Sequence, residues 1–486
     1  MINWQKILNN STLIQTGLLI NGNWKTDRNK FNVFNPFNNE VIAEVAEASK
    51  DDINESIDSA LAAYLIWRDT TSKARAKVLR RWFELMLENV DDLAKIMTLE
   101  NGKPLSESKV EIYYAASYLE WYAEECKRID GNIIPSNQAM QKILIIKQAI
   151  GVCAAISPWN FPTAMLARKV APAIAAGCSI IARPSNQTPL SALAFAKLAL
   201  DAGLPPGVFN VLLGDSSLIA TELCKSDIVK KISFTGSTEV GIQLYKNSAD
   251  TMKRISLELG GNAPFIVFKD ADIIKAVSEL IKNKFRNSGQ TCICANRIFI
   301  ENSIKDEFLN LLKLEIAQLK VGNGLDIENS IGPLINKKAI EHTIELVNDA
   351  TSKGAKLVVG GNGHSLGGNF FEPTILINCN SKMRIFNEEI FAPVIAIYDF
   401  YLDEEVIELA NHTKYGLASY FYSNDINRIF NISEKLEYGM VGINTGGISG
   451  ENVPFGGIKH SGLGREGGHY GIEEYLNIKY LCLNLN

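Results

Sequence analysis

The sequence predicts an α/β fold built on a parallel, doubly wound sheet that is followed by a second α/β unit. Residues 151–250 alternate between apolar runs of strand length and longer runs with helical spacing, which is typical of consecutive β-α units. The strand runs are apolar throughout, as expected when helices cover both faces of a sheet. A second alternating series, from residue 263 to about residue 445, predicts the second unit.

Each part of the chain has its own pattern. Turn residues near position 36 separate two β-rich runs and predict a hairpin, whereas residues 50–128 have the three- and four-residue apolar spacing of helices. Within 151–250 we expect four strands, GVCAAISP, CSIIARP, VFNVLLG and IVKKISF, each followed by a helix. The tail EEYLNIKYLCLNL alternates, so we expect a strand that pairs elsewhere in the chain or in a partner subunit.

Composition limits the class of protein. The 486 residues are 46% hydrophobic and 21% charged, which is typical of a soluble protein of roughly two to four domains. The net charge of −5 gives no reason to expect binding to nucleic acid or to an anionic membrane. The most apolar stretch, 164–181, contains Arg168 and Lys169, and the N-terminus does not have the pattern of a signal peptide. We therefore expect a cytoplasmic protein.

The eight cysteines favour neither a disulfide scaffold nor a metal site. They are too sparse for a disulfide-stabilised chain of this length, and most have apolar neighbours. CxxC pairs are absent and the five histidines are scattered, so we expect no metal.

Cys292 is the candidate nucleophile. It lies in FRNSGQTCICAN, where Gly289 is expected to end a helix and a polar loop to expose the thiol. An exposed thiolate near amide donors or positive charge is a strong nucleophile. Read alone, the residue would more often be a structural cysteine than a nucleophile.

Glu258 and Asn160 are candidates for the groups that assist a nucleophile. Glu258 ends an apolar strand, and burial would raise the pKa of its carboxyl and suit it to general-base catalysis. The alternative is a carboxylate paired with a buried base. Asn160 follows a strand of the sheet and could donate to an oxyanion, although a helix N-cap is the simpler interpretation.

The turn FTGSTEVG, with Gly236 and Gly241, joins a strand to a helix. Glycine there permits close approach of a dinucleotide, and the helix N-terminus favours phosphate. The pattern is not GxGxxG, and glycines also occupy such turns for purely steric reasons.

Taken together, these stretches resemble the aldehyde dehydrogenase superfamily, most closely its succinate-semialdehyde dehydrogenases. The matching pieces occur in the family's order over essentially the whole chain: SPWNFP, IARPSNQTP, AGLPPGVFNVLLG, FTGSTEVG, LELGGNAPF, GQTC, NEEIFAPV and PFGGIKHSGLGRE. The resemblance implies a cofactor-binding domain (1–125 and 147–257) and a catalytic domain (258–445). It also implies a small β oligomerisation element with the C-terminal tail (126–146 and 446–486), and a homodimer or homotetramer.

The resemblance also implies a mechanism. Cys292 attacks the aldehyde carbonyl, Asn160 and the Cys292 backbone N–H hold the oxyanion, and Glu258 activates the water that hydrolyses the resulting thioester. Glu389 is expected to hold the nicotinamide ribose. Further expected cofactor contacts are Trp159, Asn160, Arg183, Pro184, Ser185, Asn186, Gly236, Ser237 and Leu259.

Three departures from the family pattern bear on cofactor and backbone. Arg183 stands where lysine is usual, and Asn186 stands where NAD-preferring members often have glutamate. A neutral residue there does not repel a 2′-phosphate and an arginine suits one, so we expect NADP to be preferred and NAD to be accepted. Ala392 replaces a usual glycine, which affects local backbone freedom only.

The expected substrate is succinate semialdehyde. Arg168, Arg286 and Ser449 match residues of the succinate-semialdehyde dehydrogenases, and two guanidinium groups with a hydroxyl can hold a carboxylate. Each arginine could instead form a structural ion pair. Other readings are an enzyme for glutarate semialdehyde or an uncharged aldehyde, a cysteine hydrolase, or a non-catalytic relative.

Cys294 lies two residues beyond the nucleophile. Some similar family members use this spacing for a reversible disulfide, and a bridge over so short a loop is strained and easily reduced. A bystander thiol is the equal alternative.

Overall fold

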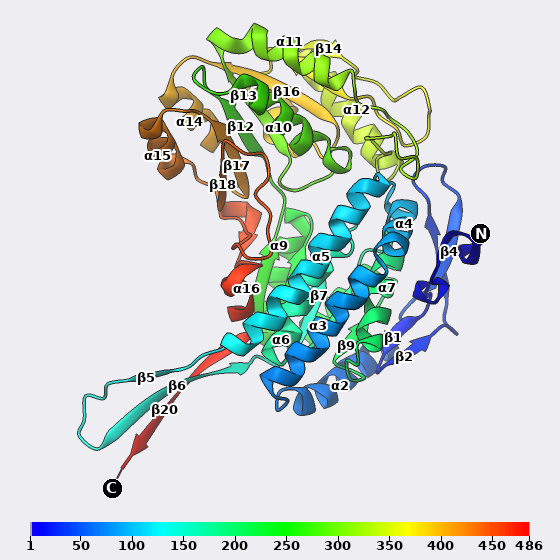
Figure 1. Ribbon diagram of the computed structural model, residues 1–486, viewed down its shortest axis with the longest axis vertical. Helices are drawn as coiled ribbons and strands as arrows, with labels where there is room; N and C mark the ends of the chain where they lie inside the picture. The colour runs from blue at the N-terminus through cyan, green and yellow to red at the C-terminus, as the bar shows by residue number, and fades with distance from the viewer. Residues whose placement is uncertain (1, 486) are drawn as a thin grey trace.

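The computed structural model describes residues 2–485, and its body is built on two open sheets (Figure 1). The larger has the strand order β19-β11-β10-β7-β8-β9-β1-β2. Its strands are β1 (Leu18–Ile20), β2 (Asn23–Lys25), β7 (Val152–Ile156), β8 (Ser179–Arg183), β9 (Phe209–Val211), β10 (Val229–Thr235), β11 (Arg254–Glu258) and β19 (Gly462–Leu463). The neighbours from β11 to β9 are parallel, and the strands expected in 151–250 are those that form this central part.

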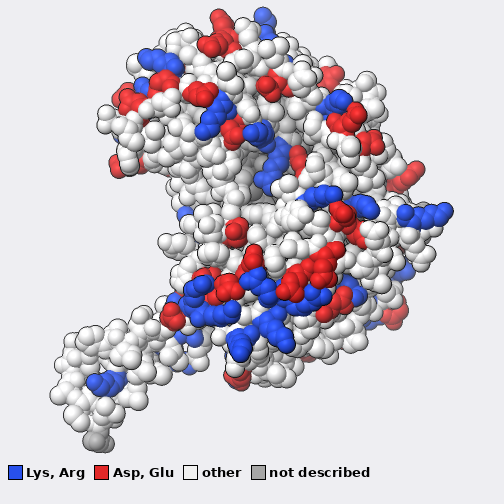
Figure 2. Space-filling view, viewed as in Figure 1, with Lys and Arg blue, Asp and Glu red and all other residues white. Residues whose placement is uncertain are grey.

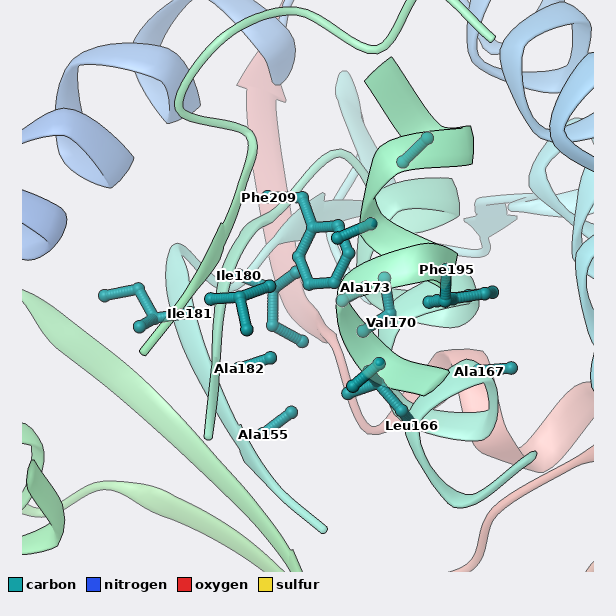
Figure 3. Close-up of a cluster of buried hydrophobic side chains, with 14 of the residues drawn as sticks. Ala155, Leu166, Ala167, Val170, Ala173, Ile180, Ile181, Ala182, Phe195 and Phe209 are labelled. Carbon is teal, nitrogen blue, oxygen red and sulfur yellow. The ribbon is translucent and has the colours of Figure 1, made fainter. Parts of the chain in front are cut away.

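Helices cover this sheet because its strands are apolar on both sides. The crossover helices are α6 (Ala164–Ala176), α7 (Pro189–Asp201), α8 (Ser216–Lys225) and α9 (Thr238–Asn247). The N-terminal helices α3 (Ser72–Glu88), α4 (Val90–Asn101) and α5 (Leu105–Glu125) pack on α6 and α7, while α2 (Lys50–Trp67) packs on β8 and α8. Figure 3 shows Val170 and Ala173 of α6 beside Ile180 and Phe209 of neighbouring strands. This close packing fixes the ends of the strands, where the site lies.

The second sheet lies at the top of Figure 1 and has the order β14-β15-β16-β13-β12-β17-β18. Its strands are β12 (Ala263–Val267), β13 (Ala295–Glu301), β14 (Lys356–Val359), β15 (Thr374–Ile377), β16 (Val394–Phe400), β17 (Ala418–Tyr422) and β18 (Met440–Ile443). Its main helices are α10 (Ile273–Phe285), α11 (Lys305–Ile316), α12 (Lys337–Ser352), α14 (Asp403–Asn411) and α15 (Ile426–Lys435). The predicted second α/β unit is therefore present.

A narrow arm leaves the body at the lower left of Figure 1. It consists of β5 (Asn132–Ile134), β6 (Gln141–Ala149) and β20 (Leu476–Asn484), in the order β20-β6-β5. The alternating C-terminal tail thus pairs within the chain, antiparallel to β6. The hairpin expected near position 36 is also present, as β3 (Lys30–Phe34) and β4 (Val41–Ala46).

The segment 446–486, expected as one oligomerisation element and tail, is divided in the structure. β19 joins the larger sheet, with Gly462 opposite Glu258, and only β20 enters the arm. A two-residue strand inside the glycine-rich run SGLGREGG has no period that a pattern could reveal. Among residues 2–485, no helix combines the length and apolar character needed to cross a membrane.

Candidate active site

The candidate site is a cavity of about 260 Å³ between the carboxyl ends of β10 and β11 and the loop before β13. In doubly wound sheets this edge is where ligands bind. Its lining includes eight of the predicted site residues: Trp159, Asn160, Gly236, Ser237, Glu258, Leu259, Cys292 and Glu389. The fold therefore gathers residues that lie far apart in the sequence.

Two further cavities lie on the other side of Cys292. A small one, of about 20 Å³, is bounded by Arg168, Arg286, Cys292, Ser449 and other residues, and it has room for about one water molecule. An outer cavity of about 230 Å³ is also bounded by Arg286 and Ser449. Cys292 lines both the larger cavity and the small one, so its thiol lies between two approaches.

The loop before Cys292 has an unusual backbone. α10 ends at Phe285, before Gly289, because Asn287 (φ 48°) and Ser288 (φ 57°) already adopt left-handed conformations. Hydrogen bonds support this strain: Asn287 N donates to Glu107 Oε2 at 2.6 Å, and Ser288 Oγ donates to Gly332 O at 2.8 Å. The expectation that the helix ends at Gly289 was therefore wrong, since it ends at Phe285. The three consecutive left-handed residues 287–289 hold the thiol in place.

The Cys292 thiol is partly buried, and less exposed than a polar loop suggested. Burial raises the pKa of this thiol to about 12, Glu389 adds to the rise and Arg168 opposes it. At neutral pH the thiol is therefore protonated in this state, and a base is needed to make it a nucleophile.

Glu258 has the surroundings of a general base. Its side chain is 3% exposed, and neither carboxylate oxygen has a hydrogen-bond partner among residues 2–485. Burial first, and then the neighbouring Glu466, raise the pKa of this carboxyl well above its usual range, against the effect of Arg168 and Lys169. An unpartnered carboxylate with a raised pKa can accept a proton near neutral pH.

Asn160 is held firmly beside the nucleophile loop, residues 286–294, which carries the predicted nucleophile Cys292. The side-chain Nδ2 of Asn160 donates to Gln290 O at 3.0 Å. Its backbone carbonyl accepts from Lys103 Nζ at 2.6 Å and from Asn287 Nδ2 at 2.9 Å. A side-chain amide has two N–H groups, so one remains for an oxyanion at Cys292. The N-cap alternative does not apply, since the cap of α6 is Thr163.

Glu389 faces the larger cavity from the second sheet's side. Its Oε1 accepts from Gly261 N at 3.2 Å, and burial raises the pKa of the carboxyl to about 8. Phe391, with φ 52°, packs edge-on against Trp159 with ring centroids 5.7 Å apart. Together these residues form one wall of the cavity.

The loop after β8 carries the residues expected to choose the cofactor. Asn186 is fixed by Gly214: its Nδ2 donates to Gly214 O at 2.8 Å, and its Oδ1 accepts from Gly214 N at 3.2 Å. Burial lowers the pKa of Arg183 to about 10, partly offset by Asp215, and the Arg183 Nε has no partner among the described residues. Pro184 and Ser185 complete the turn, with Ser185 Oγ accepting from Gln187 N at 3.2 Å.

The glycines of FTGSTEVG make room for side chains of the chain itself. A Cβ on Gly236 would lie 2.5 Å from the Phe234 ring, and one on Gly241 would lie 2.4 Å from Leu259. Gly236 also lines the cavity. Gly241 does not, and its role is steric because it leaves room for the Leu259 side chain. Ser237 caps α9 through its side chain, which accepts from Val240 N.

The two arginines differ sharply in their partners. Arg168 is 1% exposed, its Nη2 lies 3.0 Å from Glu466 Oε2, and its Cζ lies 3.8 Å from the Phe455 ring centroid. Arg286 is partly exposed and lies over the Phe161 ring at 4.7 Å, and its guanidinium has no ion pair or side-chain hydrogen bond among the described residues, although Glu107 is close enough to interact with it electrostatically. Arg168 therefore already forms an ion pair, whereas the Arg286 guanidinium can still bind an anion.

Cys294 points away from the site. It is 4% exposed, its Sγ donates to Lys284 O at 3.6 Å, and burial raises the pKa of the thiol. In this structure Cys292 and Cys294 are both free thiols.

The comparisons with known proteins agree with this geometry. A family model described as "Aldehyde dehydrogenase family" matches residues 24–481. The chain belongs to the aldehyde dehydrogenase family. The resemblance inferred from the motifs is thus confirmed, and so is the fold class.

Individual relatives are similar over nearly their whole length. The chain is 52% identical to the NADP(+) succinate-semialdehyde dehydrogenase GabD of Escherichia coli (strain K12), over 98% of this chain and 100% of that protein. It is also 52% identical to a glutarate-semialdehyde dehydrogenase of Pseudomonas aeruginosa, over 98% and 99%. The crystal structure of succinate-semialdehyde dehydrogenase from Burkholderia pseudomallei superposes with a TM-score of 0.97 at 50% identity, covering 98% and 99%.

Sequence reasoning missed two charged residues beside Glu258. Lys169 Nζ pairs with Glu466, and it donates to Thr235 Oγ1 at 2.7 Å. A signal for Glu466 was present, since a carboxylate inside the glycine-rich run GLGREGG is unusual. The sequence could not show that Glu466 pairs with Arg168 and Lys169, because these residues meet only through the tertiary fold.

Proposed function

We propose that this aldehyde dehydrogenase oxidises succinate semialdehyde to succinate with NADP, and accepts NAD less well. The observation that carries the proposal is Arg286, whose guanidinium has no ion pair among residues 2–485 and lines, with Ser449, the small cavity ending at Cys292. A substrate carboxylate can fill that place by charge-assisted hydrogen bonds, which puts its aldehyde end at the thiol.

In the proposed reaction Cys292 is deprotonated, and Glu258, which lines the same cavity, is the acceptor. The thiolate adds to the aldehyde carbon, and one N–H of Asn160 with the backbone N–H of Cys292 stabilises the oxyanion. A nicotinamide bound in the larger cavity would accept the hydride from the former aldehyde carbon, and the carbon held by Cys292 would then be a thioester. Glu258 passes its first proton to solvent and then takes a proton from water. The hydroxide attacks the thioester carbon, and the C–S bond breaks to release the carboxylic acid and the Cys292 thiolate.

The cofactor cavity fits a dinucleotide. The turn at Gly236 and Ser237 leads into the N-terminus of α9, which favours phosphate, and Glu389 faces the same space. We assign Trp159, Leu259 and the loop from Arg183 to Asn186 to cofactor binding. The buried Nε of Arg183, which has no partner among residues 2–485, supports a contact with a 2′-phosphate.

The five-carbon glutarate semialdehyde is the second candidate. A relative with that name is as similar to this chain as GabD.

We further propose a cytoplasmic homodimer or homotetramer that assembles through the arm, with the domain boundaries expected from the family except that β19 belongs with the larger sheet. Supporting this, the arm surface in Figure 2 is almost free of charge, and Ile133, Ile478 and Tyr480 are 78%, 71% and 66% exposed. Exposed apolar strands of this kind normally pack against a partner.

The decisive experiment compares succinate semialdehyde with butanal in an Arg286→Ala variant. Loss of a charge-assisted contact of about 1.5–3 kcal/mol should lower kcat/KM for the semialdehyde about ten- to a hundredfold, and leave butanal within about threefold. Lys282→Ala is the matched control, because it removes an exposed cation that lies four residues before Arg286 and bounds the same outer cavity. Equal loss on both substrates in Arg286→Ala would contradict the proposed substrate.

A further inference from the structure

Asn283, in the last turn of α10, joins the nucleophile loop to the loop that carries Ser449. Its Oδ1 accepts from Ala295 N at 2.7 Å, directly after the nucleophile loop, and its Nδ2 donates to Gly446 O at 2.8 Å. The side chain is 8% exposed. One planar amide therefore connects the two loops that face the two ends of a bound semialdehyde.

A second contact holds the Ser449 loop to the same helix. Glu279 Oε2, one turn before Asn283, accepts from Gly446 N at 3.1 Å. The loop approaches the helix so closely that a Cβ on Gly446 would lie 2.8 Å from the Glu279 carbonyl oxygen. Gly446 is thus held through both its N–H and its C=O, and no larger residue fits without moving the loop.

The end of α10 therefore sets three positions at once. Arg286 follows the helix directly, the nucleophile loop is tied to Asn283 through Ala295, and Ser449 lies three residues after the clamped Gly446. A shift of the Gly446 loop changes the distance between the carboxylate end of the site and Cys292 while the thiol stays in place. Misplacement by about 1 Å can cost about a hundredfold in rate.

We infer that Asn283 is a positioning residue that fixes the distance between Cys292 and the carboxylate-binding end, and so selects the chain length of the ω-semialdehyde. The inference rests on the proposed recognition of a carboxylate by Arg286 and Ser449. It goes beyond it by assigning chain-length discrimination to a residue that does not touch the substrate.

The test is an Asn283→Asp variant, assayed with succinate semialdehyde, glutarate semialdehyde and butanal. Aspartate keeps the acceptor for Ala295 N and loses the donor to Gly446 O, so only the Ser449 loop is released. The ratio of kcat/KM for the two semialdehydes should move toward one by about three- to tenfold, mainly through KM, with butanal changed less than about twofold.

Gly446→Ala tests the same contact from the other side, because its new Cβ must push the loop off α10 while Asn283 is intact. Both variants should relax discrimination in the same direction, and Ile274→Ala, at an exposed residue of the same helix, should leave it unchanged. Thermal melting and cofactor binding report whether each variant is folded.

Three outcomes would overturn the inference: a wild-type ratio already near one, an unchanged ratio in both folded variants, or an equal loss on butanal. Failure of the substrate proposal is seen separately, in Arg286→Ala. If Arg286→Ala selectively loses the semialdehydes while Asn283→Asp discriminates like the wild type, only the positioning role is wrong.

Discussion

Arg168 and Glu466 form a buried ion pair, with Arg168 Nη2 3.0 Å from Glu466 Oε2 and side chains that are 1% and 5% exposed. Lys169 pairs with the same carboxylate. One acid therefore neutralises two cations of adjacent residues in α6, immediately behind the proposed general base.

This pairing predicts that the two candidate substrate arginines behave differently when each is replaced. Arg168→Ala should lower the free energy of unfolding by about 3–5 kcal/mol, because it breaks a buried ion pair, and should reduce turnover of charged and uncharged aldehydes alike. Arg286→Ala has no ion pair to break and should change stability by less than about 1 kcal/mol. Denaturant unfolding of both variants checks this. A fully stable Arg168→Ala that loses only succinate semialdehyde would instead restore Arg168 as a substrate contact.

Removing the proposed base should separate the two halves of the reaction. Glu258→Gln cannot take a proton from water, so a thioester should accumulate after a burst of reduced cofactor. Rapid-mixing absorbance measurements, with acid-quenched mass spectrometry of Cys292, detect both. Cys292→Ala serves as the control and should show neither burst nor turnover, with cofactor binding nearly intact. Steady turnover by Cys292→Ala would refute the nucleophile assignment.

Cofactor preference should depend on the charge at position 186. Asn186→Glu places a carboxylate beside Arg183 and should shift the NADP/NAD ratio of kcat/KM toward NAD by about tenfold or more. Asn186→Ser is the neutral control for the lost hydrogen bonds to Gly214. A wild-type enzyme that already prefers NAD by about tenfold would show the prediction wrong.

Glu389 should make stability depend on pH in a defined direction. Burial raises the pKa of its carboxyl from 4.5 to about 8, so the folded protein keeps a proton that the unfolded chain releases. The contribution of Glu389 to the free energy of unfolding is fully present below pH 4.5 and is lost as the pH rises to about 8. Glu389→Gln, which mimics the protonated form, should become increasingly stable relative to the wild type as the pH rises through this range. Thermal midpoints of the two proteins without cofactor measure the difference, and parallel curves would contradict it.

Cys294 should protect the nucleophile under mild oxidation. Peroxide would convert the Cys292 and Cys294 thiols to a disulfide with release of water, and dithiothreitol would restore activity. The Cys294 side chain must first rotate from the Lys284 carbonyl, so the bridge should form slowly. Cys294→Ala should lose activity irreversibly and faster than the wild type under peroxide. Equal irreversible loss in both would leave Cys294 as a packed thiol.

The sequence by itself determined the four consecutive β-α units within 151–250, because fully buried parallel strands must be apolar throughout and crossover helices must bury one face. It also marked Cys292, Glu258 and Asn160 as candidates, and the resemblance of their motifs to the family gave each a role. Local patterns of this kind are properties of consecutive residues, so no tertiary information was needed.

Only the tertiary structure decided which arginine has a counterion. The sequence does not show which arginine has a counterion, because Arg168 lies in an apolar run, Arg286 lies in the polar run KNKFRNSGQ, and Glu466 lies far from both. Folding brings Glu466 to Arg168, because pairing of β19 with β11 carries the C-terminal loop back over α6, and it gives Arg286 no ion pair among residues 2–485. The early end of α10 at Phe285 and the amide clamp of Asn283 depend on the tertiary fold in the same way. Their hydrogen-bond partners come from segments that no local pattern connects.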